Sequence, residues 1–557
     1  MGAGRRAGGA GARGGAGVQK DRANMSFVFV VMFFAVFGLI VLTEMFLIDE
    51  RRGAGGIGGG RRVGHRFSGA GGVPDRADYE EIGVSVPDLR RSLGRGRRLI
   101  LHPLQVEDYA VPRVGGAARP GPSLPPGLEA RLPPLDPGLA ATHAEWLPVT
   151  NTRFKFFVYS AYFDDRVGAG PGLVRVIGAT RTRGPERVWC RFWYRRDGNA
   201  TASLTVAAKV KVIRENWNLK YSACFVICPL PRNPPTRERV PRAVSVVARL
   251  KAAPANRLLV RNRPEFRPKT RQPLAVCVKP LHYDYNRVLQ LVEFIELHRL
   301  LGATHVTLYN DTVGTEAGCV LGDYEAKGLV TILPWHRLDM ISQTEIRTEG
   351  LFAALNDCLY RSMYEYEYVA LLDLDEFIVP RHNDTILDLI RWMGERVNVK
   401  STGAFSFQNA FFYLQWNDDS AVIKSRSRAE AGLVTLRKTR RRANLHPHKQ
   451  RSKYVCRPED VVEAGNHFVW EFIPGHGTLN VPSKSAILHH YRVCEFGGND
   501  CVKTESVVDR RAYKYRDRLA RNVDGVWTEL AEKCSLPELD PVPTPAPAPD
   551  PTPRTAR

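Results

Sequence analysis

Three carboxylates stand within four residues at Asp373-Leu374-Asp375-Glu376, directly after the apolar run of residues 368–372. A strand that ends in ionised carboxylates is costly to bury unless a cation meets them. Two aspartates that alternate along a strand end can present their oxygens to one divalent ion, and hard oxygen ligands suit Mg²⁺ or Mn²⁺. Bound to a diphosphate, such an ion acts as a Lewis acid. The spacing therefore predicts that Asp373 and Asp375 hold a metal.

Other polar side chains follow apolar runs in the same half of the chain. Lys279 follows the run at 274–278, and Asn310 and Asp311 follow the run at 304–309. Residues 287–301, 316–327 and 344–364 are helical in pattern, and 329–333 is a further strand. Strands that alternate with helices predict an α/β domain with a mostly parallel sheet. In such sheets ligands bind at the carboxyl ends of the strands, so these side chains are expected at one edge.

Residues 151–265 have a different texture. Short runs rich in β-branched and aromatic residues, separated by turn residues, occur at 154–162, 174–179, 188–194, 204–213, 221–227 and 243–250. This pattern predicts a small antiparallel β unit with a structural or acceptor-presenting role. Cys190, Cys224 and Cys228 are its candidates for a cross-link.

Residues 25–42 form an uncharged run that covers about 27 Å as a helix, close to the thickness of a bilayer core. With the apolar residues 45–48, it predicts a signal anchor at 25–48 that follows a cytoplasmic tail at 1–24. Residues 49–150 are rich in Gly, Pro, Ala and Arg and predict a flexible stem. The Pro-rich residues 535–557 predict a disordered tail.

The remaining composition favours a luminal, glycosylated body. The chain has 557 residues, too many for one ordinary domain, and ten cysteines, which suit an oxidising compartment. Acceptor sequons begin at Asn199, Asn310 and Asn383. The formal charge of +22 attracts polyanions, but no C2H2, RNP or helix-turn-helix pattern supports nucleic acid as a partner. We therefore expect no nucleic-acid function.

A series of ordered motifs in this chain resembles glycosyltransferase family 92. The matching stretches begin at Leu274 and are 274–280, 291–296, 300–305, 309–311, 356–361, 371–380, 457–458 and 489–492, with 160–166 in the β region. The resemblance implies a GT-A type nucleotide-sugar-binding domain over 272–534, Mn²⁺ and an inverting transfer. It further implies a UDP-galactose-dependent β-1,4-galactosyltransferase that extends galactose or fucose of N-glycans. The anchor, the cysteines and the sequons predict a single-pass type II protein with a luminal body, so we expect it in the Golgi membrane.

The same resemblance assigns the binding residues. Asp373 and Asp375 would bind the metal and the nucleotide, and Lys279, Asn310 and Asp311 would line the uridine and ribose site. A glycan at Asn310 would stand beside that site, so only the sequons at Asn199 and Asn383 are expected to be occupied.

Two further roles are assigned near the C-terminal end. A histidine there completes the metal shell, for which His490 fits, with His489 as the alternative. An inverting transfer also needs a carboxylate that deprotonates the acceptor hydroxyl. Glu463 is predicted as this base by its position in the chain alone, with Asp460 and Glu471 as alternatives.

The chain also departs from the family pattern. Ahead of Asn356 it has Glu349-Gly350 where Gly-Gln is expected, which weakens any sugar-contact role there. The basic run at 438–442 could clamp a diphosphate or an anionic acceptor, although such runs are commonly solvated loops.

Two other functions remain open at this stage. The letters around Asp373 also resemble the first motif of haloacid-dehalogenase-type phosphatases, in which the first Asp is the nucleophile. That motif expects Thr where Phe377 stands and a later acidic pair, for which Asp418-Asp419 is a poor match. The second alternative is an inactive, membrane-tethered glycan-binding protein.

Overall fold

A computed structural model of the chain describes residues 124–166, 172–196, 201–420, 428–494 and 500–539. The chain divides into two units, Met1–Val73 and Pro74–Arg557, and all of these residues belong to the second unit. The predicted cytoplasmic tail, the signal anchor at 25–48 and Asn199 lie outside the described residues. Among the helices that are described, none is long and apolar enough to cross a bilayer.

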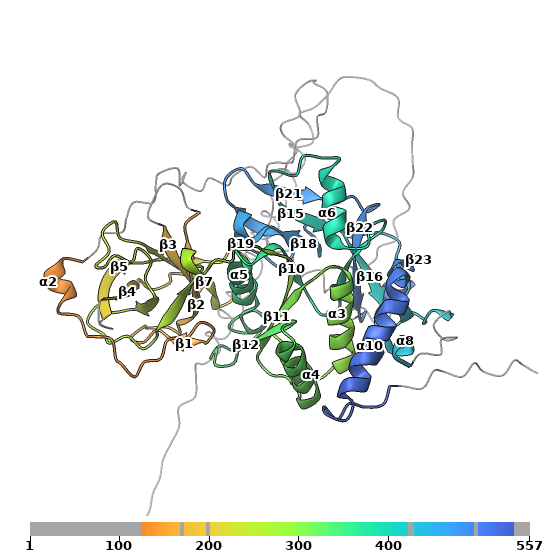
Figure 1. The fold of residues 1–557 in the computed structure, drawn as a ribbon, viewed down its shortest axis with the longest axis horizontal. Coiled ribbons are helices and arrows are strands. Elements are labelled where there is room, and N and C mark those ends of the chain that lie inside the picture. The colour runs from red at the N-terminus through yellow and green to blue at the C-terminus, as the bar shows by residue number, and fades with distance from the viewer. Residues whose placement is uncertain (1–123, 167–171, 197–200, 421–427, 495–499, 540–557) are drawn as a thin grey trace, which may run out of the picture. The chain divides into compact units, whose positions relative to one another are not determined.

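The predicted β unit is a nine-stranded sheet (Figure 1). Its order is β5-β4-β8-β9-β2-β3-β7-β6, with β1 paired to β2; all pairs are antiparallel except β2 with β9. The predicted run at 204–213 is divided into two strands. The strands are β1 (Leu147–Pro148), β2 (Phe157–Asp164), β3 (Leu173–Arg181), β4 (Trp189–Arg195), β5 (Thr201–Ala207), β6 (Lys209–Val212), β7 (Tyr221–Pro229), β8 (Ala243–Val247) and β9 (Leu258–Arg261).

The last part of the predicted stem belongs to this unit. Residues 124–150 contain the short helix α2 (Pro126–Glu129). Trp146 and Val149 of this segment are buried in the hydrophobic core. The Glu129 carboxylate accepts hydrogen bonds from the backbone and the hydroxyl of Thr205 on β5. The prediction of a flexible stem is therefore wrong for residues 124–150.

The second sheet has seven strands in the order β12-β11-β10-β13-β18-β15-β21. Strands β10 (Gln272–Val278), β11 (His305–Asn310), β12 (Val330–Pro334) and β13 (Tyr366–Leu372) are parallel. Strand β18 (Lys453–Cys456) runs antiparallel between β13 and β15 (Thr402–Phe407), which pairs with β21 (Gly477–Asn480). The prediction of a mostly parallel sheet is thus wrong, since the sheet is mixed.

Smaller sheets complete the domain. The strand β14 (Glu376–Pro380) pairs with β22 (Ala486–Arg492), which also pairs with β16 (Asn409–Tyr413). The two-stranded ribbons are β17 (Arg440–Arg442) with β23 (Ser506–Val508), and β19 (Val461–Ala464) with β20 (Val469–Phe472).

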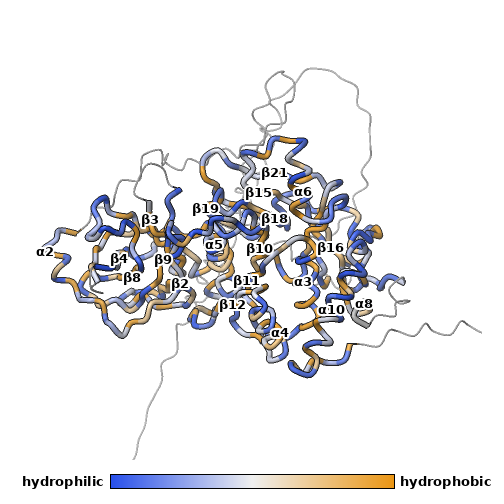
Figure 2. The backbone as a smooth tube through the Cα atoms, viewed as in Figure 1, coloured by the Kyte–Doolittle hydropathy of each residue, from blue (hydrophilic) through white to orange (hydrophobic). Residues whose placement is uncertain are grey.

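The helices cover the strands of the second sheet (Figure 1). The α-helices are α3 (Val288–Leu300), α4 (Thr315–Ala326), α5 (Leu351–Ser362), α6 (Ile386–Gly394), α8 (Arg428–Gly432), α9 (Val434–Arg437) and α10 (Arg516–Leu530). The 3-10 helices are η3 (Pro264–Phe266), η4 (Thr348–Gly350), η5 (Pro458–Asp460), η6 (Asp500–Lys503) and η7 (Arg511–Tyr515). Helix α10 packs along α3. Hydrophobic stretches follow β10 and α5 in Figure 2, in keeping with their burial.

Helix α5 lies between the two large sheets and contacts β3 and β7 on one side and β10 on the other. Its Asp357 is fully buried and accepts hydrogen bonds from Tyr162 on β2 at 2.6 Å and from Tyr309 on β11 at 2.8 Å. The hydroxyl of Ser160 and the guanidinium of Arg361 also donate to it. A buried charge is tolerated when it is paired and hydrogen-bonded in this way. Asp357 therefore ties the β unit to the second sheet.

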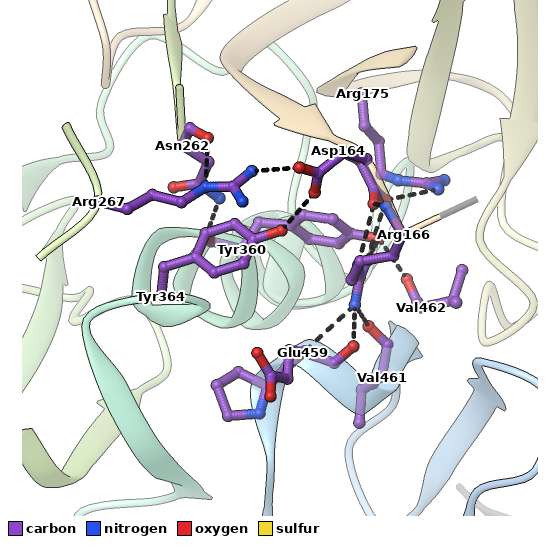
Figure 3. Close-up of polar contacts among 12 residues, drawn as sticks. Asp164, Arg166, Arg175, Asn262, Arg267, Tyr360, Tyr364, Glu459, Val461 and Val462 are labelled. Atoms are coloured by element: carbon purple, nitrogen blue, oxygen red, sulfur yellow. Dashed lines mark hydrogen bonds and ion pairs between the residues drawn. The ribbon is translucent and has the colours of Figure 1, made fainter. Parts of the chain in front are cut away.

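Arg166 makes a second tie, which Figure 3 shows in detail. Its Nε lies 2.9 Å from Asp164 Oδ1, and its Nη1 donates to the backbone oxygens of Glu459 at 2.7 Å and Val461 at 2.8 Å. Burial alone would raise the pKa of Asp164, but the charge of Arg166 outweighs burial and holds that pKa below its ordinary value. Residues of the motif at 160–166 thus make several of the contacts that join the β unit to the rest of the domain.

Four disulfides join described residues. They are Cys190–Cys228 in the β unit, Cys277–Cys358 between β10 and α5, Cys319–Cys534 and Cys494–Cys501. Cys224 and Cys456 are buried thiols. Of the three cysteines singled out in the β unit, Cys224 is therefore not cross-linked.

Candidate active site

The acidic turn lies where β13 ends and the chain enters β14. Asp373 Oδ2 is 2.6 Å from Lys279 Nζ, at the end of β10, and 3.4 Å from Lys453 Nζ, at the start of β18. Because β18 runs antiparallel to β13 and pairs Tyr454 with Leu371, Lys453 stands at the carboxyl end of β13. The Lys453 side chain is only 1% exposed, so this cation is part of the protein interior.

Lys453 connects the turn to its surroundings. Its Nζ lies 3.3 Å from Glu376 Oε2 and donates to Asn466 Oδ1 at 2.9 Å. Burial would raise the pKa of Asp373, but the charges of Lys279 and then Lys453 outweigh burial and hold that pKa well below its ordinary value. Burial would lower the pKa of Lys453, but Asp373 and Glu376 outweigh it and raise that pKa. Asp373 and Lys453 are therefore both charged at neutral pH.

His490 faces the same turn from β22. Its Nε2 lies 3.3 Å from Asp375 Oδ2, and its Nδ1 lies 3.4 Å from Glu376 Oε1 and 3.0 Å from Asn409 Nδ2. Neighbouring side chains on a strand point to opposite faces, and His489 instead stacks on Phe412 in the core. Burial lowers the pKa of His489 to about 4. Of the two histidines, His490 is the one that lies at the acidic turn.

The side chains at the acidic turn carry oxygen and nitrogen atoms that can bind a divalent ion. Asp375 and His490 converge, and Asp373 Oδ1 is buried with no hydrogen-bond partner in the described part of the chain. Oxygen and imidazole donors suit Mn²⁺, so the chemistry of the set fits. Within the described ranges, however, no three His, Cys, Asp or Glu side chains are already grouped as a metal site, since Asp373 Oδ2 is turned to two lysines.

The predicted nucleotide residues gather at the same edge. Strands β11 and β13 are both neighbours of β10, so Asn310, Asp311 and Asp373 follow strand ends on either side of Lys279. The amide of Asp311 donates to Leu281 O at 3.0 Å, which fixes the loop that follows Lys279. Burial, and then the charge of Glu349, raise the pKa of Asp311. The sequence placed these side chains at one edge, and the structure confirms that placement.

Glu463, predicted as the catalytic base, lies at the contact between β19 and the β unit. It is fully buried on β19, where Lys211 Nζ of β6 lies 2.7 Å from Oε2 and the Arg214 amide donates to Oε1 at 2.8 Å. Glu471 pairs with the same two cations, at 2.6 Å from Lys211 Nζ and 2.7 Å from Arg214 Nη2. A fully buried carboxylate that is paired with a lysine cannot reach an acceptor hydroxyl. Glu463 therefore joins the β unit to β19, and its assignment as the catalytic base is wrong.

Asp460 is at the other edge of the sheet. The register pairs Cys456 with Val369, so the chain passes the amino end of β13 before it reaches Asp460. There Asp460 Oδ2 lies 3.1 Å from His476 Nδ1. We therefore assign the base to none of the three predicted carboxylates.

The basic run at 438–442 is used within the fold. Lys438 Nζ lies 2.6 Å from Asp418 Oδ1, and Arg441 Nε lies 3.1 Å from Asp509 Oδ2. Asp419 in turn pairs with Arg510 at 2.6 Å. These contacts give the basic run a structural role, and they occupy the acidic pair that the phosphatase alternative requires.

Sequence reasoning missed Lys453, Asn466 and Asn409. Lys453 begins a strand of only four residues, and Asn409 begins β16. Short strands carry little periodic signal, and a buried lysine contradicts the usual preference of lysine for solvent. Only the pairing of β18 with β13 brings Lys453 to the site.

The fold and the site define a mixed α/β domain that gathers lysines, carboxylates and a histidine at the carboxyl ends of its parallel strands. Residues 272–536 match the family model described as Glycosyltransferase family 92, which confirms the resemblance over that segment. Two similar *Caenorhabditis elegans* proteins are "Glycosyltransferase family 92 protein F13G3.3", 27% identical over 146 residues, and "Beta-1,4-galactosyltransferase galt-1", 24% identical over 261 residues. The alignments cover 25% and 45% of this chain and only 29% and 54% of those relatives.

Similar solved structures include *S. aureus* TarS in complex with UDP, at 11% identity and a TM-score of 0.23 over 40% of this chain and 60% of that one. Another is glucosyl-3-phosphoglycerate synthase from *Mycobacterium tuberculosis* in complex with Mn²⁺, UDP and glucosyl-3-phosphoglycerate. It is 11% identical, with a TM-score of 0.19 over 48% of this chain and 81% of that one. The strand order and register of the two large sheets define the fold.

Proposed function

We propose that the chain is an inverting, metal-dependent glycosyltransferase. It would move galactose from UDP-galactose in β-1,4 linkage onto galactose or fucose of N-glycans. The observation that carries the proposal is the pairing of His490 with Asp375, beside Asp373 and Lys279, within the segment that matches family 92. The galactosyl group and the β-1,4 linkage follow from the similarity to the Caenorhabditis elegans protein named beta-1,4-galactosyltransferase galt-1.

The residues at the carboxyl ends of the parallel strands would bind different parts of the donor. Asp375 and His490 would hold Mn²⁺ or Mg²⁺, with Asp373 Oδ1 beside them. When bound, the ion supplies positive charge to the departing UDP. Lys279 reaches the same edge from β10 and can contact phosphate oxygens, while Asn310 and Asp311 line the nucleoside side. Lys453 holds the acidic turn in position through its ion pair with Glu376, and Asn466 in turn holds Lys453 by a hydrogen bond.

The location in the cell is part of the proposal. We place the chain in the Golgi membrane, single-pass and type II, with the described domain in the lumen. The four disulfides support this, because such bonds persist in oxidising compartments. Asn383, on the partly exposed loop before α6, is the proposed glycosylation site among the described residues, and Asn199 is the second proposed site.

The test uses the full-length protein in detergent. UDP release from UDP-galactose would be measured with Mn²⁺ and with EDTA, on N-glycans that end in galactose or in fucose. We expect metal-dependent turnover that is lost in Asp375→Ala and kept in Asp339→Asn, a control on an exposed carboxylate. Hydrolysis of phosphate esters without transfer would favour the phosphatase, and glycan binding without either activity would favour the inactive glycan-binding protein.

A further inference from the structure

Three consecutive residues before α5 have left-handed backbone. The φ angles are 37° at Thr348, 47° at Glu349 and 77° at Gly350. A non-glycine residue in this region is strained and persists only where its surroundings hold it. Here Trp335 Nε1 donates to Glu349 O at 2.5 Å, and the Glu349 amide donates to Ser342 Oγ at 3.3 Å. The structure thus maintains a strained turn at Glu349.

The strained turn keeps the Glu349 carboxylate in the interior. Its side chain is 13% exposed, and Oε2 is buried without a hydrogen-bond partner among the described residues. The imidazole of His282 places its Nε2 3.8 Å from Glu349 Oε2, beyond hydrogen-bond distance. Leaving a buried carboxylate oxygen without a donor costs free energy, so the position suits a ligand that brings donors.

The surroundings indicate the chemistry of that ligand. Asp311 belongs to the same region, because its amide donates to Leu281 O and the following His282 lies 3.8 Å from Glu349. Burial, and then the charge of Glu349, raise the pKa of Asp311. Tyr283 follows His282 in the chain, and the centroids of their rings lie 4.4 Å apart. Tyr283 is 76% exposed. Tyr283 and the following Asp284 also have left-handed backbone, with φ of 59° and 49°. An exposed ring beside paired acceptors suits a flat base joined to a diol.

We propose that Glu349 is a specificity-determining residue, which accepts a hydrogen bond from a ribose hydroxyl of the nucleotide together with Asp311, while Tyr283 stacks on the base. The order of residues along the edge fits this assignment. His282 follows Lys279 by three residues, and Lys279 Nζ contacts Asp373, so base, ribose, diphosphate and metal would lie in sequence. The inference rests on the proposed function, because it takes a uridine nucleotide as the ligand.

The experiment measures binding by calorimetry on the full-length protein with Mn²⁺. The probes are UDP, 2′-deoxy-UDP and 3′-deoxy-UDP. In the natural sequence, UDP is expected to bind at least roughly tenfold more tightly than one or both deoxy analogues, since charge-assisted hydrogen bonds are strong. Glu349→Gln is expected to weaken UDP binding roughly 10- to 100-fold and to reduce that preference. Asp339→Asn, on the same stretch of chain and 78% exposed, is the matched control.

The outcomes separate the two proposals. Absence of UDP binding would overturn the proposed function itself. UDP binding that does not distinguish UDP from either deoxy analogue would overturn the inference alone, and this result needs no variant. An unchanged preference in a folded Glu349→Gln protein would overturn it as well. Tyr283→Ala is expected to weaken all three nucleotides equally, because stacking does not sense the ribose hydroxyls.

Discussion

Lys453→Met tests the role of the buried lysine beneath the acidic turn. The substitution keeps a long side chain but removes the cation that lies 3.3 Å from Glu376 and 3.4 Å from Asp373. Asp373 keeps Lys279, whereas Glu376 loses its lysine and is itself only 1% exposed. Removing one partner of a buried ion pair costs about 3–5 kcal/mol, and we take about 3 kcal/mol because Asp373 stays compensated.

The assay is thermal unfolding of the purified protein. With an unfolding entropy of about 2.1 cal/mol/K per residue, about 3 kcal/mol corresponds to a fall in the midpoint of roughly 4–5 °C for a domain of this size. Lys220→Met is the matched control, because Lys220 pairs with Glu345 at the surface and should show no measurable change. The midpoint shift of Lys279→Met should lie between those of Lys453→Met and Lys220→Met. A shift below about 2 °C for Lys453→Met would refute the reasoning that this cation compensates buried carboxylates.

Three further predictions concern other parts of the structure. Asp375→Asn and His490→Ala should each weaken Mn²⁺ binding by about tenfold or more, measured by water-proton relaxation without substrate; unchanged affinity would move the metal elsewhere. Breaking Cys277–Cys358 by double substitution to Ser opens a link across 81 residues and should cost about 4 kcal/mol in urea unfolding, whereas an unchanged midpoint would contradict this. Burial lowers the pKa of His298 to about 4 from its ordinary 6.5, so its stabilising contribution is present above pH 6.5 and is lost as pH falls toward 4. His298→Phe should therefore reduce the loss of unfolding free energy between pH 7 and pH 4 by roughly 3 kcal/mol, and equal losses in both proteins would argue against this.

The parallel half of the second sheet was predictable, because it consists of regular alternation. The continuous apolar run before Lys279 predicted β10, and apolar residues at helical spacing predicted α3; the structure confirms both. Helix α5 was predicted to begin at residue 344 but begins at Leu351, since positive φ angles at 348–350 interrupt a sequence that is otherwise helical in character. Such backbone angles depend on tertiary contacts and leave little trace in a single sequence.

The residues of the site that follow regular strands were predictable, whereas those on short strands were not. Asp373, Asp375 and His490 come together because strand ends meet at one edge, which is a general property of these sheets. Glu463 was chosen by its position along the chain, and that position does not specify which face a short strand presents. Its partner Lys211 lies in the β unit, more than two hundred residues away in sequence, so only the assembled fold reveals the pair.

The Asp357 network has a consequence for how the chain is made. Ser160 and Tyr162 leave the ribosome 197 and 195 residues before the carboxylate that they contact. At ordinary synthesis rates this interval is roughly 10–40 seconds. Throughout that time the hydroxyls on β2 have no internal acceptor on α5, and the inner face of the β unit stays open to water and chaperones. The β unit therefore completes its folding only after helix α5 has been synthesised, and a nascent chain that stalls before residue 357 is expected to be a target for quality control.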